Sequence, residues 1–101
     1  MSNEIETLFI ALPFEDKREI ILHGTALYLS TLKKRLFLAI AKIEQFEKKY
    51  QISLDKLDSE GLPDDADYHR HEDFILWHHW ADTGKKLKEQ INSLNKLHPQ
   101  T

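Results

Sequence analysis

The stretch from Leu22 to Tyr50, LHGTALYLSTLKKRLFLAIAKIEQFEKKY, decides the fold of this 101-residue chain. It contains no proline and only one glycine, and its apolar residues recur at alternating steps of three and four. The residues at seven-residue spacing are Leu22, Leu29, Leu36, Ile43 and Tyr50, and those between them are Thr25, Leu32, Ala39 and Phe46. This spacing is typical of a helix that packs along its whole length on another helix. We therefore expect one long helix over residues 14–50.

A second long helix is expected over residues 68–97, with Pro99 stopping it. Its apolar stripe also has spacings of three or four and consists of Phe74, Trp77, Ala81, Gly84, Leu87, Ile91 and Leu94. The aspartates in residues 64–67 are favourable N-caps for this helix. Two interpretations of Gly84 stay open: it allows close approach of the partner helix, or it is tolerated there at a cost of roughly 1 kcal/mol relative to alanine.

Residues 51–67 form an acidic connection with a short helical turn. Ser53 is placed to cap residues 54–57, and Gly61 is placed to end that turn with a positive φ. Before the first long helix, residues 3–12 form a short helical arm, which Pro13 separates from the helix that follows. The apolar face of the arm consists of Ile5, Leu8, Phe9 and Leu12. This face packs either on its own chain or on a partner.

Composition excludes several classes of protein. The absence of cysteine excludes disulfides, thiol catalysis and thiolate zinc sites. Three glycines and three prolines argue against a β architecture and against glycine-rich phosphate loops. No apolar run approaches the roughly 18 residues of a membrane span, and the N-terminus has no basic leader. We expect a single all-α domain over residues 1–101 that is cytoplasmic and not an enzyme.

A thin hairpin of two helices leaves apolar side chains uncovered. Two helices of about 30 residues extend roughly 45 Å, and helices that are apolar on more than one face pack on more than one neighbour. The predicted partner-binding residues are Phe37, Leu38, Ile75, Leu76, Trp77 and Trp80. We expect a long antiparallel helical hairpin that forms a four-helix bundle as a homodimer, or that binds a different partner with the same surface. In the alternative, the arm folds back and covers these residues.

The net charge of −3 is unevenly distributed. Residues 55–73 contain eight acids and two bases, a local charge of −6, whereas the rest of the chain contains nine acids and twelve bases. The acidic tip consists of Asp64, Asp65, Asp67, Glu72 and Asp73. Such a surface steers a basic protein and repels nucleic acid, although helix capping also explains aspartates at this place. The basic runs at 33–35 and 85–86 lack interleaved aromatic residues, so we expect no direct binding of nucleic acid.

Four histidines, His69, His71, His78 and His79, follow the connection. His71, His78 and Asp82 are the metal-ligand candidates, because side chains one or two turns apart on a helix can converge on one ion. No His-Glu-x-x-His and no Glu-x-x-His pattern is present, so we expect no metal and no other cofactor. Imidazoles at a wet interface also predict weaker association near about pH 6, where they become charged.

The order of residues around the connection resembles a known group of proteins. FEKKY at 46–50 ends one helix, SLDKL at 53–57 forms a turn, GLPDDADY at 61–68 is acidic, and HEDFILW at 71–77 begins the return helix. Within residues 43–80 this order resembles small prokaryotic helical-hairpin proteins regarded as antitoxin-like partners in toxin–antitoxin pairs. The resemblance implies a protein that binds and neutralises a basic toxin, and it implies no catalytic residue. A structural homo-oligomer without a toxin and a His/carboxylate metal-binding bundle are the alternative hypotheses.

Overall fold

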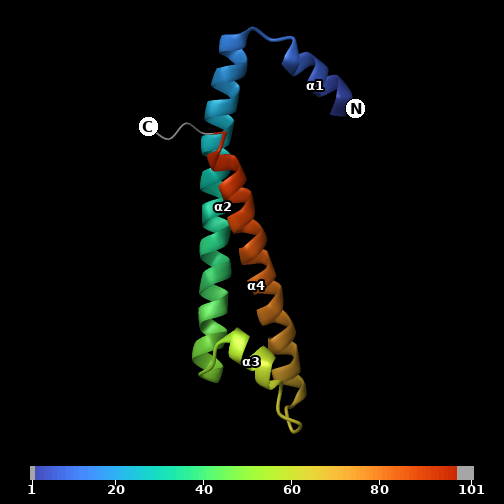
Figure 1. Ribbon diagram of the computed structural model, residues 1–101, viewed down its shortest axis with the longest axis vertical. Helices are drawn as coiled ribbons and strands as arrows, with labels where there is room; N and C mark the ends of the chain where they lie inside the picture. The colour runs from blue at the N-terminus through green and yellow to red at the C-terminus, as the bar shows by residue number, and fades with distance from the viewer. Residues whose placement is uncertain (1, 98–101) are drawn as a thin grey trace.

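The computed structural model describes residues 2–97, and within them it contains α-helices and no strand. The helices are α1 (Ser2–Ile10), α2 (Phe14–Tyr50), α3 (Leu54–Glu60) and α4 (Tyr68–Asn95). α2 and α4 run antiparallel and pack side by side as a hairpin, with α3 between their lower ends (Figure 1). This confirms the all-α hairpin with a short N-terminal helix. The predicted stop at Pro99 lies outside the described residues.

The helix ends follow from capping side chains and backbone conformation. The Ser53 hydroxyl accepts a hydrogen bond from the Lys56 backbone N–H, and the Asp67 carboxylate accepts one from the Arg70 N–H. α3 is longer than the predicted single turn and ends at Gly61, whose φ of 77° and ψ of 164° lie in a region that essentially only glycine adopts. α2 ends at Gln51 in the left-handed region, which its sequence does not indicate because side chains other than glycine and asparagine seldom adopt it.

The predicted apolar stripes form the contact between α2 and α4. Every residue of both stripes is buried or half-buried. The central cluster consists of Leu29 and Leu32 from α2 and Leu87 and Ile91 from α4. Burying this apolar surface is what stabilises the pair, since neither helix makes extensive contact with any other helix in residues 2–97.

Gly84 lies at the middle of the seam, opposite Leu36 and Ala39. A Cβ atom added to Gly84 would lie 3.9 Å from the Ala39 Cβ and 3.9 Å from the Leu36 Cδ1, which is ordinary van der Waals contact. The helices therefore do not approach closely enough to require glycine. Of the two interpretations of Gly84, the structure favours tolerance.

In the view of Figure 1, α2 and α4 separate toward α3. Aromatic side chains from both helices pack together at that end. The Trp77 ring stacks on Phe46 and Tyr50 with centroid distances of 5.7 and 6.1 Å. Leu57 of α3 is buried in the same region and closes the end of the hairpin. The short helix α3 thus covers these aromatic rings at the end of the hairpin.

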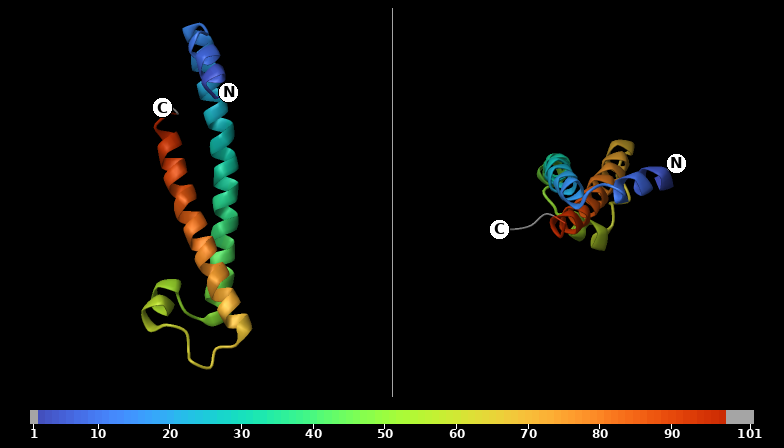
Figure 2. Two further views of the ribbon diagram at one scale, coloured as in Figure 1. Left: turned by 90° about the vertical axis from the view of Figure 1, so that its right-hand side faces the viewer. Right: turned by 90° about the horizontal axis from the view of Figure 1, so that it is seen from above.

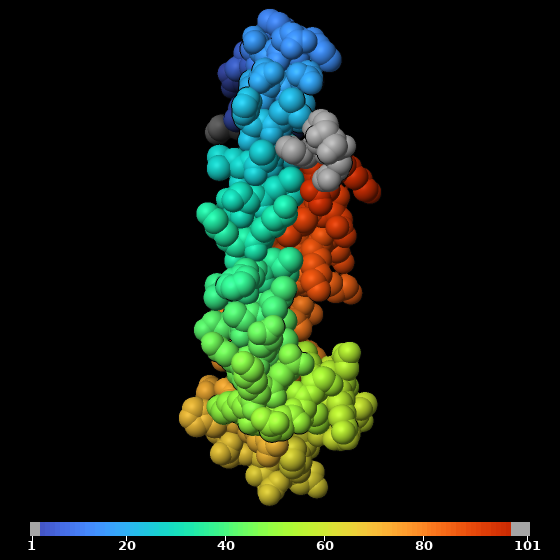
Figure 3. Space-filling view, turned by 90° about the vertical axis from the view of Figure 1, so that its left-hand side faces the viewer, coloured from blue at the N-terminus to red at the C-terminus, as the bar shows by residue number. Residues whose placement is uncertain are grey.

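The molecule is elongated, as the helix lengths predict. Its radius of gyration is 20.0 Å and its extents are 64 × 35 × 19 Å, whereas a compact chain of this length has a radius of gyration of about 13 Å. The N-terminal part of α2 extends beyond the end of α4, and the opposite end is widened by α3 and its connections (Figures 2 and 3). No helix in residues 2–97 is long and apolar enough to span a bilayer.

α1 projects away from the hairpin instead of covering it (Figures 1 and 2). Its apolar residues Ile5, Leu8 and Ile10 are 71%, 65% and 68% exposed. The alternative in which the arm folds back over the apolar residues of its own hairpin is therefore wrong for this structure. Pro13 explains the separation, because a proline cannot continue the hydrogen-bonding pattern of a helix.

Candidate functional site

The structure divides the predicted partner-binding residues into three groups. Trp77 has no exposed surface and lies within its own chain, stacked between α2 and α4. The prediction that Trp77 contacts a partner is therefore wrong. Its place on the predicted apolar stripe of residues 74–94 indicates a core position.

Leu38 and Trp80 lie together in a groove between α2 and α4. They line a hollow of about 370 Å³ whose other residues are Arg35, Thr83, Lys86, Leu87 and Gln90. A second hollow of about 510 Å³ is lined by Tyr28, Lys86, Glu89, Gln90, Ser93 and Leu94. Because Lys86 and Gln90 line both hollows, the two hollows adjoin and form one groove along the hairpin. We call this surface, from Tyr28 and Leu94 to Leu38 and Trp80, the groove.

The remaining three predicted residues lie beside or outside the groove. Leu76 also lines neither hollow, but it is one turn before Trp80 on α4 and 48% exposed, so it continues the row of groove residues just beyond the groove. Phe37 and Ile75 are 77% and 68% exposed and line neither hollow. Each directly precedes a residue of the groove row, and successive residues point about 100° apart around a helix. The apolar surface thus has one concave part and two separate exposed side chains.

Two basic side chains line the middle of the groove, and four others lie at the same level of the hairpin. Gly84 lies next to Leu36, so residues near 35 and residues near 86 are at the same level of the hairpin. The six basic residues at this level are Lys33, Lys34, Arg35, Lys85, Lys86 and Lys88. None of them forms a salt bridge within residues 2–97. We call this band the basic waist; Arg35 and Lys86 are its members on the two walls of the groove.

Asp73 is not a free acidic residue of the tip. Its carboxylate accepts hydrogen bonds from Lys49 Nζ at 2.6 Å and from the Tyr50 hydroxyl at 2.5 Å, and its side chain is only 14% exposed. These bonds, first that of Lys49 and then that of Tyr50, lower the pKa of Asp73, while burial and the same carboxylate raise the pKa of Tyr50. Asp73 therefore joins α2 to α4, which corrects its assignment to the acidic tip.

The rest of the predicted tip is divided between structural and unpaired carboxylates. Asp67 caps α4. Asp58 of α3, which is not part of the predicted tip, contacts His78 Nε2 at 2.7 Å. Asp64, Asp65 and Glu72 form neither a salt bridge nor a side-chain hydrogen bond within residues 2–97. These last three residues are what remains of the acidic tip as a charged surface.

The metal-ligand candidates do not form a site in one chain. In residues 2–97 no group of three histidine, aspartate or glutamate side chains is arranged to hold a metal ion. His78 pairs with Asp58 of α3 and not with His71 or Asp82. None of the four histidines of this region lines the groove, but His79 packs edge-on against Trp80, which does, with ring centroids 5.5 Å apart; the predicted pH effect on association stays a prediction.

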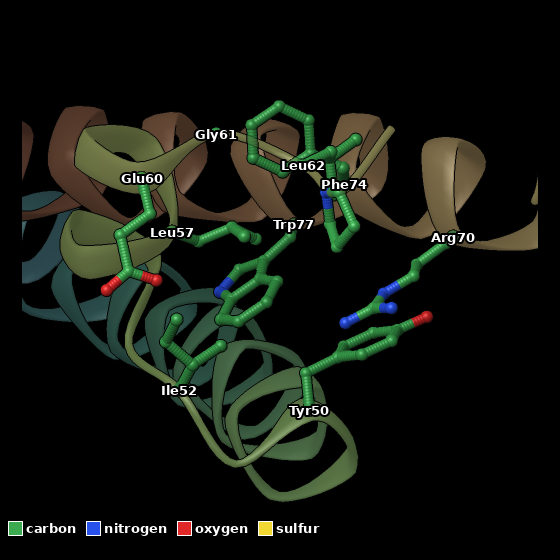
Figure 4. Close-up of a pocket in the computed structure, with 10 residues that line it drawn as sticks. Tyr50, Ile52, Leu57, Glu60, Gly61, Leu62, Arg70, Phe74 and Trp77 are labelled. Carbon is green, nitrogen blue, oxygen red and sulfur yellow. The ribbon is translucent and has the colours of Figure 1, made fainter. Parts of the chain in front are cut away.

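A small pocket of about 120 Å³ lies beneath α3 (Figure 4). The indole nitrogen of Trp77 is buried there without a hydrogen-bond partner among the described residues. Figure 4 shows this nitrogen on the side of Glu60, with Arg70 on the opposite side, where its guanidinium lies 5.3 Å from the Tyr50 ring centroid. An unpaired buried donor costs roughly 1–3 kcal/mol, and a water molecule in the pocket would satisfy it.

Comparisons with protein families, with curated proteins and with solved structures found no match for this chain. The resemblance to antitoxin-like hairpins therefore stays a prediction. The groove and the charges around it are what bear on function.

Proposed function

We propose that this protein is an interaction module that acts by binding, and that its groove takes an amphipathic helix of another polypeptide. One observation carries the proposal. The hairpin leaves a concave apolar strip between α2 and α4, in which Leu38 is 49% exposed and Trp80 is half-buried. A hydrophobic strip between two helices is the surface on which helix-in-groove recognition depends.

The charges around the groove select the class of helix. Arg35 and Lys86 stand on opposite walls and have no carboxylate partner within the described residues. A helix whose apolar stripe is flanked by glutamate or aspartate would pair with both walls. A helix with basic flanks would be repelled, because like charges brought together at an interface cost binding free energy.

The narrower role predicted from sequence, neutralisation of a basic toxin, would also use the other end of the molecule. Asp64, Asp65 and Glu72 offer unpaired negative charge at the tip, and a basic partner would be attracted to it at long range. In this form of the proposal the groove holds an acidic helix of the partner while the tip faces its basic surface. Co-expression with the neighbouring genes tests it, since a toxin partner would copurify with the wild-type chain and be lost with Asp64→Lys/Asp65→Lys.

Site-specific photo-cross-linking tests the groove itself. A photoreactive amino acid is placed at Leu38 or at Leu76, and the matched controls are Phe37 and Ile75, which precede them in the chain and are at least as exposed. Cross-linking is carried out in the cell of origin, with the products identified by mass spectrometry. We expect the same polypeptide to be captured from Leu38 and Leu76 and not from Phe37 or Ile75. Equal yields from all four positions, or none, would contradict the proposal.

A further inference from the structure

We propose that the helix that occupies the groove in the free protein is α1 of a second copy of this chain, in an antiparallel dimer whose two arms are exchanged. This inference rests on the proposed function, because it names the occupant of the same groove. Four observations lead to it. α1 is not packed on its own chain, its charges complement those of the groove, its length is comparable to that of the groove, and the arm of the same chain is too short to reach the lower end of the groove.

α1 lacks a packing partner in its own chain. It has nine residues, and an isolated helix shorter than about 12–15 residues is only marginally stable in water. Ile5 and Leu8 of its apolar face are 71% and 65% exposed, and Phe9 is half-buried. A helix this short and this apolar requires a surface to pack on.

The charges of α1 complement those of the groove. With 3.6 residues per turn, Ile5, Leu8 and Phe9 share one face, and Glu4 and Glu6 lie about 100° to either side of it. The arm thus presents one carboxylate on each flank of its apolar stripe, and residues 2–12 contain no basic residue. The lower hollow of the groove, beside Leu38 and Trp80, presents Arg35 on the α2 wall and Lys86 on the α4 wall and has no acidic residue in its lining, whereas Glu89 lines the upper hollow. Each glutamate therefore faces one basic wall when the apolar face is seated.

The lengths of the two surfaces are comparable. The groove spans ten steps of α2 from Tyr28 to Leu38, or about 15 Å at 1.5 Å per residue, and fourteen steps of α4 from Trp80 to Leu94, or about 21 Å. The nine residues of α1 span about 13 Å on the same scale. One arm therefore covers most of the α2 wall of one groove and roughly two thirds of its α4 wall.

The arm of the same chain cannot reach the lower part of this groove. Leu38 lies 24 residues after Phe14, or about 36 Å along α2. The three connecting residues 11–13 and the whole of α1 together extend at most about 24 Å. In the antiparallel register proposed here, Phe14 of the second copy lies beside Tyr50 of the first copy, so its arm starts only about 18 Å along the helix from Leu38. Only an arm from another chain therefore seats between Leu38 and Trp80.

The oligomeric state in solution is the first test. Sedimentation equilibrium of the full chain should show a dimer at micromolar concentration. Leu8→Glu should raise the dissociation constant by roughly 100-fold or more, because two apolar contacts are lost in each dimer and each 1.4 kcal/mol changes an equilibrium constant tenfold. The matched control is Ile10→Glu, at an equally exposed position on the opposite face of α1, which should leave the dimer intact. Both substitutions are at exposed sites, and circular dichroism verifies that the helices remain.

Charge reversal tests whether Glu4 and Glu6 of the arm pair with Arg35 and Lys86 of the groove. Glu4→Lys/Glu6→Lys should weaken the dimer by at least about tenfold, since two attractive contacts become repulsive. Arg35→Glu/Lys86→Glu should weaken it similarly. A chain that carries all four substitutions should regain most of the affinity. If the combined chain is weaker than either double variant, the charges do not meet and the proposal is overturned.

Disulfide trapping distinguishes exchange between chains from folding back within one chain. The sequence contains no cysteine, so single cysteines can be introduced without a background. Mixing a Leu8→Cys chain with a Leu38→Cys chain should give a disulfide-linked heterodimer, whereas Ile10→Cys with Leu38→Cys should give little. A chain with both Leu8→Cys and Leu38→Cys that forms only an intramolecular disulfide would overturn the proposal.

The outcomes separate this inference from the proposed function. A wild-type chain that stays monomeric, or a dimer that Leu8→Glu does not weaken, overturns the arm exchange. If Leu38 and Leu76 still cross-link to another polypeptide in that case, the proposed function stands. If the groove positions capture neither a second copy nor any other polypeptide, both are overturned.

Discussion

Replacing Gly84 with alanine should stabilise the protein, although Gly84 is buried in the seam between α2 and α4. Glycine in a helix interior costs about 1 kcal/mol relative to alanine, because the backbone loses more conformational freedom on folding. At a buried position this gain can be reversed if the new methyl group has no room. The contacts of the added Cβ atom therefore decide the sign.

The structure gives that methyl group room. Its two nearest neighbours in the partner helix are the Ala39 Cβ and the Leu36 Cδ1, both at 3.9 Å, so it fits without displacing either helix. The methyl group also buries apolar surface, which adds up to about 0.8 kcal/mol. We expect Gly84→Ala to raise the free energy of unfolding by about 1–2 kcal/mol. For a chain of this size each kcal/mol raises the Tm by roughly 4–8 °C.

Two other glycines are matched controls. Gly24 lies in α2, and an added Cβ atom there has no neighbour within 4 Å, so Gly24→Ala should gain only the backbone contribution of about 1 kcal/mol. Gly61 ends α3 with a φ of 77°, so Gly61→Ala should lose roughly 1–3 kcal/mol through strain. The expected order of stability is Gly84→Ala first, then Gly24→Ala, wild type and Gly61→Ala.

Urea unfolding followed by circular dichroism at 222 nm measures this order. All four proteins are compared at one concentration, because self-association raises apparent stability by mass action. A Gly84→Ala protein less stable than wild type would refute the reasoning, since it would mean that the helices are closer at this level than the 3.9 Å contacts indicate. An unchanged Gly61→Ala protein would likewise refute the assignment of the positive φ.

Three further predictions follow from other contacts. Asp73→Asn should lower stability by roughly 1 kcal/mol near pH 7, because hydrogen bonds from Lys49 and Tyr50 to a charged acceptor are weakened. The pKa of Asp73 is lowered in the folded state, so the stabilisation by its carboxylate is present above the ordinary carboxyl pKa of about 4 and is lost as pH falls through the folded pKa. Urea unfolding should therefore show that the free energy of unfolding falls less between pH 7 and pH 3 in Asp73→Asn than in wild type. Gln51→Gly should stabilise the chain by about 1 kcal/mol in the same assay, because Gln51 holds a φ of 57° at the end of α2, which glycine adopts without strain. A loss of stability would mean that the hydrogen bond from the Gln51 side chain to the Lys48 carbonyl contributes more than the strain costs. In Trp80→Phe the only tryptophan is Trp77, and its fluorescence should resist quenching by acrylamide because the side chain is buried; free quenching would contradict that burial. In the wild type, the fraction of tryptophan fluorescence that acrylamide quenches should fall as protein concentration rises, because association would cover Trp80.

The sequence alone determined the all-helical architecture and the seam. The repeats from Leu22 to Tyr50 and from Phe74 to Leu94 specify which side of each helix is buried, because only one side of each helix repeats apolar residues at this spacing. The caps at Ser53 and Asp67 were also evident, since their side chains act on backbone groups only three residues away. These features depend on interactions that are local in the chain.

Tertiary structure decided the features that depend on residues far apart in the chain. Trp77 is buried because Phe46 and Tyr50, from the end of α2, stack on its ring. Asp73 joins the two helices because Lys49 and Tyr50 lie beside its carboxylate. The groove exists because Leu38 and Trp80 meet across the hairpin, and the basic waist exists because two separate lysine-rich runs lie at one level. Periodicity tells which residues of a helix share a face. It does not tell which residues of the other helix lie opposite them, and that register, set by how the side chains of α2 and α4 pack, determines where the exposed apolar and charged groups come together.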